Sequence, residues 1–506
     1  MRLAPLLVAL TVPLTAAAEV RLPAVAGAFY PGDAEALRAE VEDHLERARA
    51  AETTPPARAV VVPHAGYGYS GATAARSFAS LPGSEIRRVI LLGPSHHVSF
   101  SGGALPATGV TAFRTPLGDV LLDLEAIAAL RGRPGFDGPS RAHGPEHALE
   151  VELPFLQVVA PDTRLVPIVV GPTTKLDSCR ALARSLASLL DDGTVVVVSS
   201  DFTHHGQRYG WNPFDGPDLA DTLLEVGRDT AGRIAAADPR GFFTQVEVSR
   251  DTVCGNRPLA VLTELVAHAF SGGGRVLEVT TSGHLTGSFD LSVTYAAIAF
   301  SGSWKAWDEP SDPPARTLEP AEGRRLLELA RATLQSWLSH DTSVASWFAD
   351  NPRASGLLMP AGAFVTLNNT GRRARTDGKL RACMGVIEAE RPLVDAVVQA
   401  AVWAAQDPRF PPLELDELDR LEVEVSVLSP SVPVASAEAI EIGRHGVVLT
   451  VDGHRAVFLP QVAVEQGWDR DAMLDHLSLK AGLARDAWRR GGSFEVFTAQ
   501  VFSEGP

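Results

Sequence analysis

Three apolar stretches, each followed by histidine, decide the fold of this chain: ARAVVVPHAGYGYSG (57–71), RRVILLGPSHH (87–97) and TVVVVSSDFTHHG (194–206). Each contains a continuous apolar run without alternation, which is typical of a parallel strand buried on both faces. The carboxyl ends of such strands line the ligand crevice of an open α/β sheet, so side chains that follow different strands converge there. The pattern predicts an α/β domain with a mostly parallel sheet and a site at its carboxyl edge.

Two histidines and one cysteine are the predicted metal ligands. His64 and His96 occupy equivalent positions just past the first two runs. Cys254 is the third, because the neighbouring Gly255 permits a close approach of the backbone and nearby arginines favour a thiolate. Two imidazoles and a thiolate suit copper, iron or zinc.

The third apolar run leads to an acid and imidazoles that suit proton transfer. We predict His204 as a catalytic proton carrier and Asp201 as the carboxylate that orients it; a helix cap is the alternative for Asp201. Tyr67, His97 and His147 are predicted to line the substrate pocket. Glu146, beside His147, is a weak candidate, because carboxylates at helix starts are common without function.

Composition limits the class of protein and its partners. At 506 residues the chain is long enough for two or three domains, and its formal charge of −16 disfavours nucleic acid. Residues 1–18 have the charge, apolar run and small residues of a cleaved signal peptide, so we expect an exported protein with no membrane segment after cleavage. A buried N-terminal helix in a cytoplasmic protein is the alternative. Three cysteines make a disulfide scaffold improbable.

The chain divides into two predicted domains. Residues 19–302 alternate strand-like and helical patterns, 303–318 read as a linker rich in Pro and charge, and 319–506 have the α+β pattern of a helix followed by hairpins. In the second domain Arg381 and Cys383 end a basic stretch and are candidates for binding an anionic small molecule. A solvated basic hairpin with a buried cysteine is the favoured alternative.

Five separated motifs of the first domain resemble the Memo family. They are AGAFYPGD (26–33), PHAGYGYSG (63–71), GPSHH (93–97), SSDFTHHG (199–206) and VCGNRP (253–258). The resemblance implies the fold of class III extradiol dioxygenases, metal ligands at His64, His96 and Cys254, and pocket residues at Asp201 and His204. A cysteine in place of the expected carboxylate favours iron or copper and a redox role over ring cleavage.

The second domain resembles the AMMECR family. Its motifs include GAFVTLNN (362–369), GKLRACMGVI (378–387), GRHGVVL (443–449) and FLPQVAVEQGW (458–468). Members of that family occur beside Memo-like and radical SAM proteins, so the resemblance implies a fusion of two partners and a radical SAM protein as a third. It implies a fold without naming a reaction.

Three functions compete for these residues. The leading hypothesis is a metal-dependent redox protein that acts on a small molecule. The second is a metal-free hydrolase or acyltransferase with Cys254 as nucleophile and His204 as base. The third is a non-catalytic scaffold that binds metal or ligand without turnover.

Overall fold

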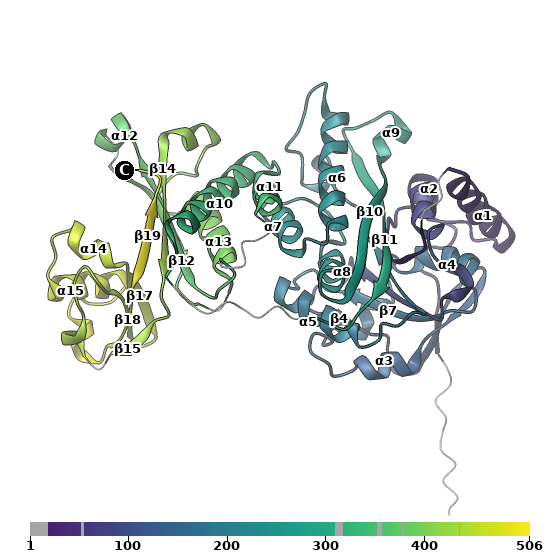
Figure 1. Ribbon diagram of the computed structural model, residues 1–506, viewed down its shortest axis with the longest axis horizontal. Helices are drawn as coiled ribbons and strands as arrows, with labels where there is room; N and C mark the ends of the chain where they lie inside the picture. Colours follow the sequence, from purple (N-terminus) through teal and green to yellow (C-terminus); the bar gives the residue numbers. More distant parts are fainter. Residues whose placement is uncertain are drawn as a thin grey trace, which may run out of the picture. The chain divides into compact units, whose positions relative to one another are not determined.

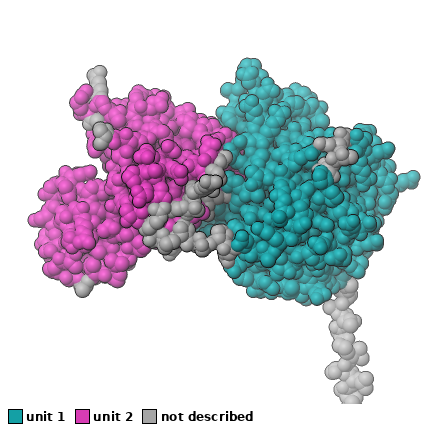
Figure 2. Space-filling model, viewed as in Figure 1, with its two compact units in different colours: residues 1–239, 252–308 teal, residues 240–251, 309–506 magenta. Residues whose placement is uncertain are grey.

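The computed structural model describes residues 19–51, 55–308, 317–351, 357–376, 378–389, 391–434 and 436–505, and the predicted signal peptide lies outside them. The chain forms two compact units (Figure 2). The first contains the described residues up to 239 together with 252–308. The second contains the described residues from 317 onward, and the short segment 240–251 belongs to it as well.

A mixed sheet forms the centre of the first unit (Figure 1). Its four middle strands are parallel, in the order β2 (Ala57–Val62), β8 (Thr194–Ser199), β3 (Arg88–Pro94) and β7 (Arg164–Val170). Antiparallel strands flank them: β11 (Ser292–Trp304) and β10 (Phe270–Thr281) on one side, β4 (Gly103–Ala104) on the other. The predicted α/β class is confirmed, and the parallel part is limited to the middle of the sheet.

Helices cover both faces of this sheet, which explains why the middle strands are apolar without alternation. Helix α2 (Tyr67–Phe78) contacts β2 and β11 and packs against α1 (Ala34–Ala51). Helix α8 (Asn256–Ala269) contacts β3 and β8, with α5 (Leu176–Ala187) packed against it. The valines of β2 and β8 are consequently fully buried.

A buried ion pair attaches the start of the described chain to the segment that carries His147. Arg21 donates to the carboxylate of Glu150, and both side chains are almost fully buried. Glu150 also accepts hydrogen bonds from the Tyr30 hydroxyl at 2.6 Å and from the backbone N–H groups of Ala24 at 2.7 Å and Val25 at 3.0 Å. The buried carboxylate is therefore well satisfied, as a stable buried charge requires.

The second unit contains two antiparallel four-stranded sheets, in the orders β13-β12-β14-β19 and β15-β18-β16-β17. The strands of the first are β13 (Leu380–Val386), β12 (Gly362–Asn369), β14 (Leu421–Leu428) and β19 (Ala499–Ser503); those of the second are β15 (Val432–Val434), β18 (Ser493–Phe497), β16 (Gly446–Val451) and β17 (His454–Phe458). Helices α10 (Pro320–Ser339) and α13 (Leu393–Ala405) pack on the first sheet around a shared apolar core. Helices α14 (Pro460–Glu465) and α15 (Arg470–Lys480) accompany the second sheet. The α+β class predicted for this half is confirmed.

The predicted hairpin in this unit has the expected turn. Val451 of β16 pairs with His454 of β17, and the two residues between them, Asp452 and Gly453, have φ angles of 49° and 80°. Positive φ at both central positions matches the right-handed twist of the flanking strands, and an Asp-Gly pair accepts it readily.

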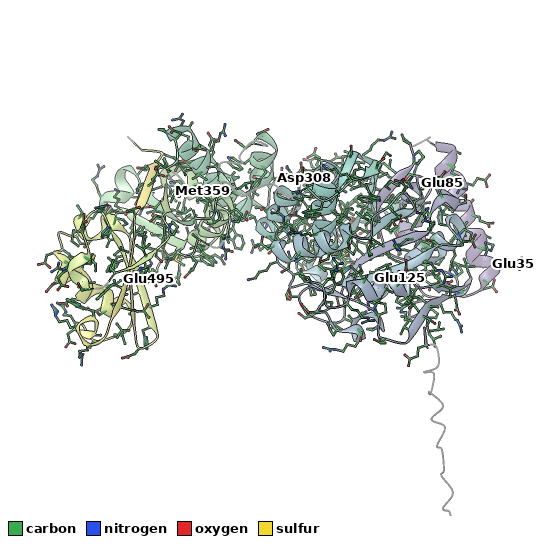
Figure 3. The ribbon with its side chains drawn as sticks, turned by 60° about the horizontal axis from the view of Figure 1, so that its bottom comes forward. Glu35, Glu85, Glu125, Asp308, Met359 and Glu495 are labelled. Atoms are coloured by element: carbon green, nitrogen blue, oxygen red, sulfur yellow. The ribbon has the colours of Figure 1, made fainter. Side chains whose placement is uncertain are left out.

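Acidic side chains account for the negative charge, and some of them lie at the surface. Glu35, Glu85 and Glu125 are exposed on the first unit, whereas Met359 is buried in the core of the second (Figure 3). Among the described residues, no helix combines the length and the apolar character that crossing a membrane would demand.

Replacement of Arg21 by Met should destabilise the first unit by about 3 kcal/mol, because it leaves the Glu150 carboxylate buried without its cation. Urea unfolding monitored by hydrogen exchange of the first unit measures the loss. Arg47→Met is the control: its partner Asp43 is 3.0 Å away in an exposed pair, and the change should be below about 1 kcal/mol. Equal stability of Arg21→Met and the parent would contradict the anchoring role.

His143 should make stability fall as the pH decreases from 6.5 to 4. Burial lowers the pKa of this side chain from 6.5 to about 4, although its Nε2 lies 2.9 Å from the Ala104 carbonyl oxygen, which opposes the shift. In this window the unfolded chain binds a proton that the folded chain does not, so each pH unit costs about 1.4 kcal/mol.

The measurement compares the pH dependence of unfolding for the parent and His143→Gln, whose slope should be smaller. His284→Gln, which removes an exposed imidazole from the same unit, should retain the parent's slope. An unchanged slope in His143→Gln would contradict the prediction.

Candidate metal centre

Three neighbouring parallel strands deliver the central side chains of the site. His64 follows β2, His96 follows β3, and Asp201 and His204 follow β8, which lies between those two strands. The register pairs Val62 of β2 with Ser199 of β8, so the residues just beyond them lie at the same level. The convergence that the sequence predicts at the carboxyl edge is present.

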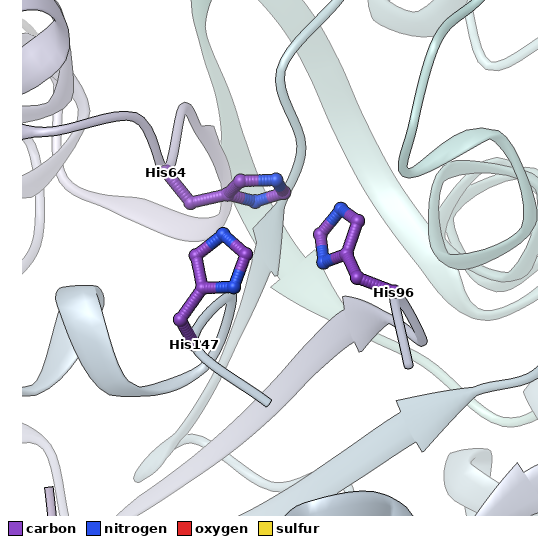
Figure 4. Close-up of side chains that lie close together, drawn as sticks. All are labelled: His64, His96 and His147. Atoms are coloured by element: carbon purple, nitrogen blue, oxygen red, sulfur yellow. The ribbon is translucent and has the colours of Figure 1, made fainter. Parts of the chain in front are cut away.

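The ligand atoms of His64, His96 and His147 lie within 4.8 Å of one another. His147 comes from the segment between residues 143 and 152 rather than from the end of a strand. Its ring stacks on that of His96, with centroids 4.8 Å apart, and the His64 and His96 rings meet edge to face at 5.2 Å. Figure 4 shows the three rings around a common space. The structure thus adds to the imidazole group a residue that we predicted as substrate-binding.

Glu146 fixes the orientation of His96. Its Oε1 lies 2.8 Å from His96 Nδ1, and its Oε2 accepts the His96 backbone N–H at 2.7 Å. Burial alone would raise the pKa of Glu146, but the hydrogen bond and charge of His96 outweigh it and bring the pKa to about 2. An ionised carboxylate at Nδ1 leaves the Nε2 lone pair of His96 free to bind a ligand. Sequence reasoning gave Glu146 too little weight.

His64 and His147 remain neutral at pH 7. Burial, followed by the neighbouring imidazoles His96, His147 and His204, holds the pKa of His64 well below its usual value. Burial and the charge of His96 bring the pKa of His147 to about 4, although Glu146 opposes them. Neutral rings keep the lone pairs that a metal ion requires.

Cys254 lies beside His64, with its Sγ 3.2 Å from His64 Nε2 and 3.3 Å from the backbone oxygen of Asp201. The glycine after it makes this position possible, because a Cβ at Gly255 would lie 2.4 Å from the Cβ of Ser200. Burial, and then the charge of Asp201, raise the pKa of the Cys254 thiol well above its usual value. In the absence of a cation, Cys254 is a neutral thiol.

Asp201 and His204 are close but have separate hydrogen-bond partners. Asp201 Oδ1 accepts the backbone N–H of His64 at 2.8 Å. His204 Nδ1 lies 2.8 Å from the carbonyl oxygen of Phe202 and 3.1 Å from that of Thr252. Because carbonyl oxygens only accept, His204 carries its proton on Nδ1 and its Nε2 can accept another. In this structure Asp201 therefore orients the backbone of His64, whereas its predicted role was to orient His204. Two backbone carbonyl groups orient the His204 ring instead.

Tyr67 and His97 differ in their exposure to solvent. Tyr67 is buried and its hydroxyl donates to the Val151 carbonyl oxygen at 2.6 Å, so this group is occupied within the fold. His97 is exposed, and its ring centroid lies 6.3 Å from that of His147. Of the two, His97 is available to a ligand that approaches the imidazole group.

Arg381 and Cys383 of the second unit have partners inside its fold. Arg381 is buried and forms an ion pair with Glu417 at 2.9 Å. Cys383 accepts a hydrogen bond from the Thr366 hydroxyl at 3.3 Å and packs at the edge of a small apolar cluster. Arg381 is thus buried in an ion pair rather than solvated, and Cys383 is half-buried.

The residues that converge here fit a transition metal ion. Three imidazoles with free lone pairs and an adjacent sulfur form a donor set that suits iron, copper and zinc. The carboxylate of Glu146 supplies the outer hydrogen bond that metal-binding histidines commonly have.

Two family models match this chain. The model described as "Memo-like protein" matches residues 21–299, and the model described as "AMMECR1" matches residues 327–502. The chain belongs to the Memo-like family. It carries an AMMECR1 domain as its second part, so both predicted resemblances are confirmed.

Curated relatives match the Memo-like part over 80% or more of their own length. A MEMO1 family protein of Methanopyrus kandleri is 36% identical over 295 residues, which cover 55% of this chain and 98% of the relative. The human protein MEMO1 is 30% identical over 287 residues, 54% of this chain and 95% of the relative. The memo-1 homolog of Caenorhabditis elegans is 31% identical, and 80% of it is covered.

Two solved structures of uncharacterized proteins also match. One, from Pyrococcus horikoshii, is 33% identical and covers 37% of this chain and 96% of its own, with a TM-score of 0.33. The other, from Escherichia coli, is 15% identical and covers 47% of this chain and 98% of its own, with a TM-score of 0.29.

The Cys254 thiol should react slowly with iodoacetamide at pH 8 in folded, chelator-treated protein, at least tenfold slower than in urea, because only the thiolate is nucleophilic and burial raises its pKa. Peptide mass spectrometry measures the rate for each cysteine. Alkylation at the unfolded rate would show that the thiol is ionised and accessible, as a nucleophile would be.

Proposed function

We propose that the Memo-like unit is a metal-dependent redox protein that binds one transition metal ion, iron or copper in preference to zinc. The observation that supports it is the convergence of His64, His96 and His147 beside the Cys254 sulfur. Iron or copper bound there would supply one-electron chemistry and activation of oxygen, as in enzymes of the extradiol dioxygenase type.

The protein's own groups have distinct tasks in this proposal. The three imidazoles and the Cys254 sulfur hold the ion. His204, with Nε2 free and its Nδ1 proton held by two carbonyl oxygens, accepts a proton from a small-molecule substrate. Asp201 holds the backbone of His64 in place, and His97 lies where it can contact the substrate.

A metal-free hydrolase is the second candidate, because the Cys254 sulfur and His64 Nε2 are at hydrogen-bond distance. Two observations weigh against it. The raised pKa of Cys254 disfavours the thiolate, and His96 and His147 would have no task. A scaffold that holds metal without turnover is the third candidate.

The AMMECR1 domain and the cell context extend the proposal. We propose that this domain binds or presents the small-molecule substrate, and that a radical SAM protein is a partner. We also propose export of the protein, on the basis of the N-terminal sequence. An iron–sulfur partner ordinarily requires a reducing compartment, which conflicts with export. Secretion assays of the full chain test the export, and co-purification tests the radical SAM partner.

Elemental analysis of protein purified without oxygen tests the metal proposal. The parent should contain about one iron or copper per chain, and His64→Ala, His147→Ala and Cys254→Ser should each lower the content at least tenfold, because each removes a donor. His284→Ala, which removes an exposed imidazole of the same unit, is the control and should retain the metal. A metal-free parent that is inactivated by thiol alkylation would favour the hydrolase instead.

A bound metal without turnover leaves the redox protein and the scaffold to be distinguished. Spectra recorded with nitric oxide and then with oxygen separate them, because a centre that activates oxygen needs an open coordination position and a closed storage site has none. A spectrum that neither gas changes would favour the scaffold.

A further inference from the structure

The hydroxyl of Ser199 lies behind His64 and has three partners. Its Oγ is 2.7 Å from His64 Nδ1, 2.6 Å from the Ala148 carbonyl oxygen and 2.9 Å from Glu152 Oε1. Ser199 ends strand β8 and is fully buried, and Glu152 and His64 are 1% and 2% exposed. A carboxyl group is thus buried at the rear of the His64 ring, one hydroxyl away from it.

The number of protons determines the direction of these hydrogen bonds. A serine hydroxyl has one proton to donate and can accept two hydrogen bonds. The Ala148 carbonyl oxygen can only accept, and it makes the shortest of the three contacts, so the Ser199 proton points to it. The other two partners must then each supply a proton: His64 from Nδ1, and Glu152 as a carboxylic acid.

The opposite arrangement is unfavourable. If Glu152 were ionised, Ser199 would have to donate to it, and two oxygens would face each other at 2.6 Å without a proton between them. The surroundings agree with the neutral form. Burial raises the pKa of Glu152 well above its usual value; the Ser199 hydrogen bond opposes this shift, and the charge of Asp201 adds to it.

We propose that Ser199 and an uncharged Glu152 are positioning residues that hold His64 with its proton on Nδ1 and its Nε2 lone pair toward the candidate metal centre. The assignment of the protons rests on the geometry alone, and its effect on metal binding rests on the proposed function. His96 is then held by an ionised carboxylate and His64 by a neutral acid through a hydroxyl, so the two ligands differ in basicity.

Two measurements on metal-free protein test the proton assignment directly. The infrared spectrum of the parent at pH 7 should contain a carboxylic acid C=O band that Glu152→Gln removes. Nitrogen-15 NMR of histidine-labelled protein, with His64 assigned through a His64→Gln variant, should show Nδ1 protonated and Nε2 not. Absence of the band, or a proton on Nε2, would overturn the proposal whether or not the protein binds metal.

Metal affinity then tests the positioning role, with cobalt(II) absorption as the readout. Glu152→Gln keeps a donor for Ser199 and should bind within about threefold of the parent. Glu152→Met and Ser199→Ala should each lose about tenfold or more, the range seen when such outer partners are removed. Ser77→Ala is the control, since it removes a buried hydroxyl bonded to the Val61 carbonyl oxygen at 2.6 Å and should leave the affinity unchanged.

The comparison with Glu146 distinguishes a neutral partner from a charged one. Glu146→Gln should lose tenfold or more where Glu152→Gln does not, because Glu146 is ionised and contacts His96 directly. Equal losses in the two Gln variants would overturn the neutral assignment. A parent that binds no cobalt and contains neither iron nor copper would refute the proposed function, while the infrared and NMR results would still decide the proton assignment.

Discussion

The parallel pairing of β2, β8 and β3 is the constraint on which the site depends. Backbone hydrogen bonds fix Val62 opposite Ser199 and Leu92 opposite Val198, so the chain leaves all three strands at one level. Asp201 can therefore accept the backbone N–H of His64, and Ser199 can reach its ring. A shift of one residue in either pairing would turn these side chains to the opposite face of the sheet.

The segment from residue 143 to 152 supplies what the strands cannot. It carries His147, which joins the imidazole group, Glu146, which contacts His96, and Glu152, which contacts Ser199. It has little regular structure of its own beyond short 3-10 turns. Its position is set by Glu150, whose buried carboxylate is held by Arg21 and Tyr30 from the start of the described chain. The ion pair between Arg21 and Glu150 is thus connected to the geometry of the site.

The sequence predicted those parts of the site that follow directly from a strand. His64, His96, Asp201 and His204 could be found because an apolar run precedes each of them, and Cys254 because a glycine follows it. His147 could be identified as a pocket residue but not as a potential ligand, since no local pattern indicates that its segment folds over the sheet. The roles of Ser199 and Glu152 could not be predicted, although Ser199 belongs to the SSDFTHHG motif, because a serine at a strand end and a glutamate in an acidic stretch are common. Their roles arise from contacts between residues 47 positions apart.

The same limitation applied to the sheet and to the second domain. Apolar runs predicted three of the four parallel strands, β2, β3 and β8, whereas β7 was not among the predicted strands. The antiparallel pairing of β10 with β11 could be recognised only from the structure itself. In the AMMECR1 domain, the Asp-Gly turn was readable because two positive φ angles demand particular residues. Arg381 illustrates the opposite case: a basic residue in a basic stretch suggests a ligand, yet Glu417, 36 positions away, neutralises it inside the fold.

Electrostatics explains why a buried group of imidazoles can exist without destabilising the protein. Three protonated rings within 4.8 Å would repel one another strongly, and burial already disfavours the charged form of His64 and His147. The fold therefore keeps these rings neutral and places an ionised carboxylate, Glu146, at His96. A cation that enters replaces no proton on His64 or His147 at neutral pH and meets a negative charge already paired to a ligand. The neutral His64 ring, backed by the buried Ser199 hydroxyl, and the His96 ring, backed by the Glu146 carboxylate, therefore form a group that favours a cation.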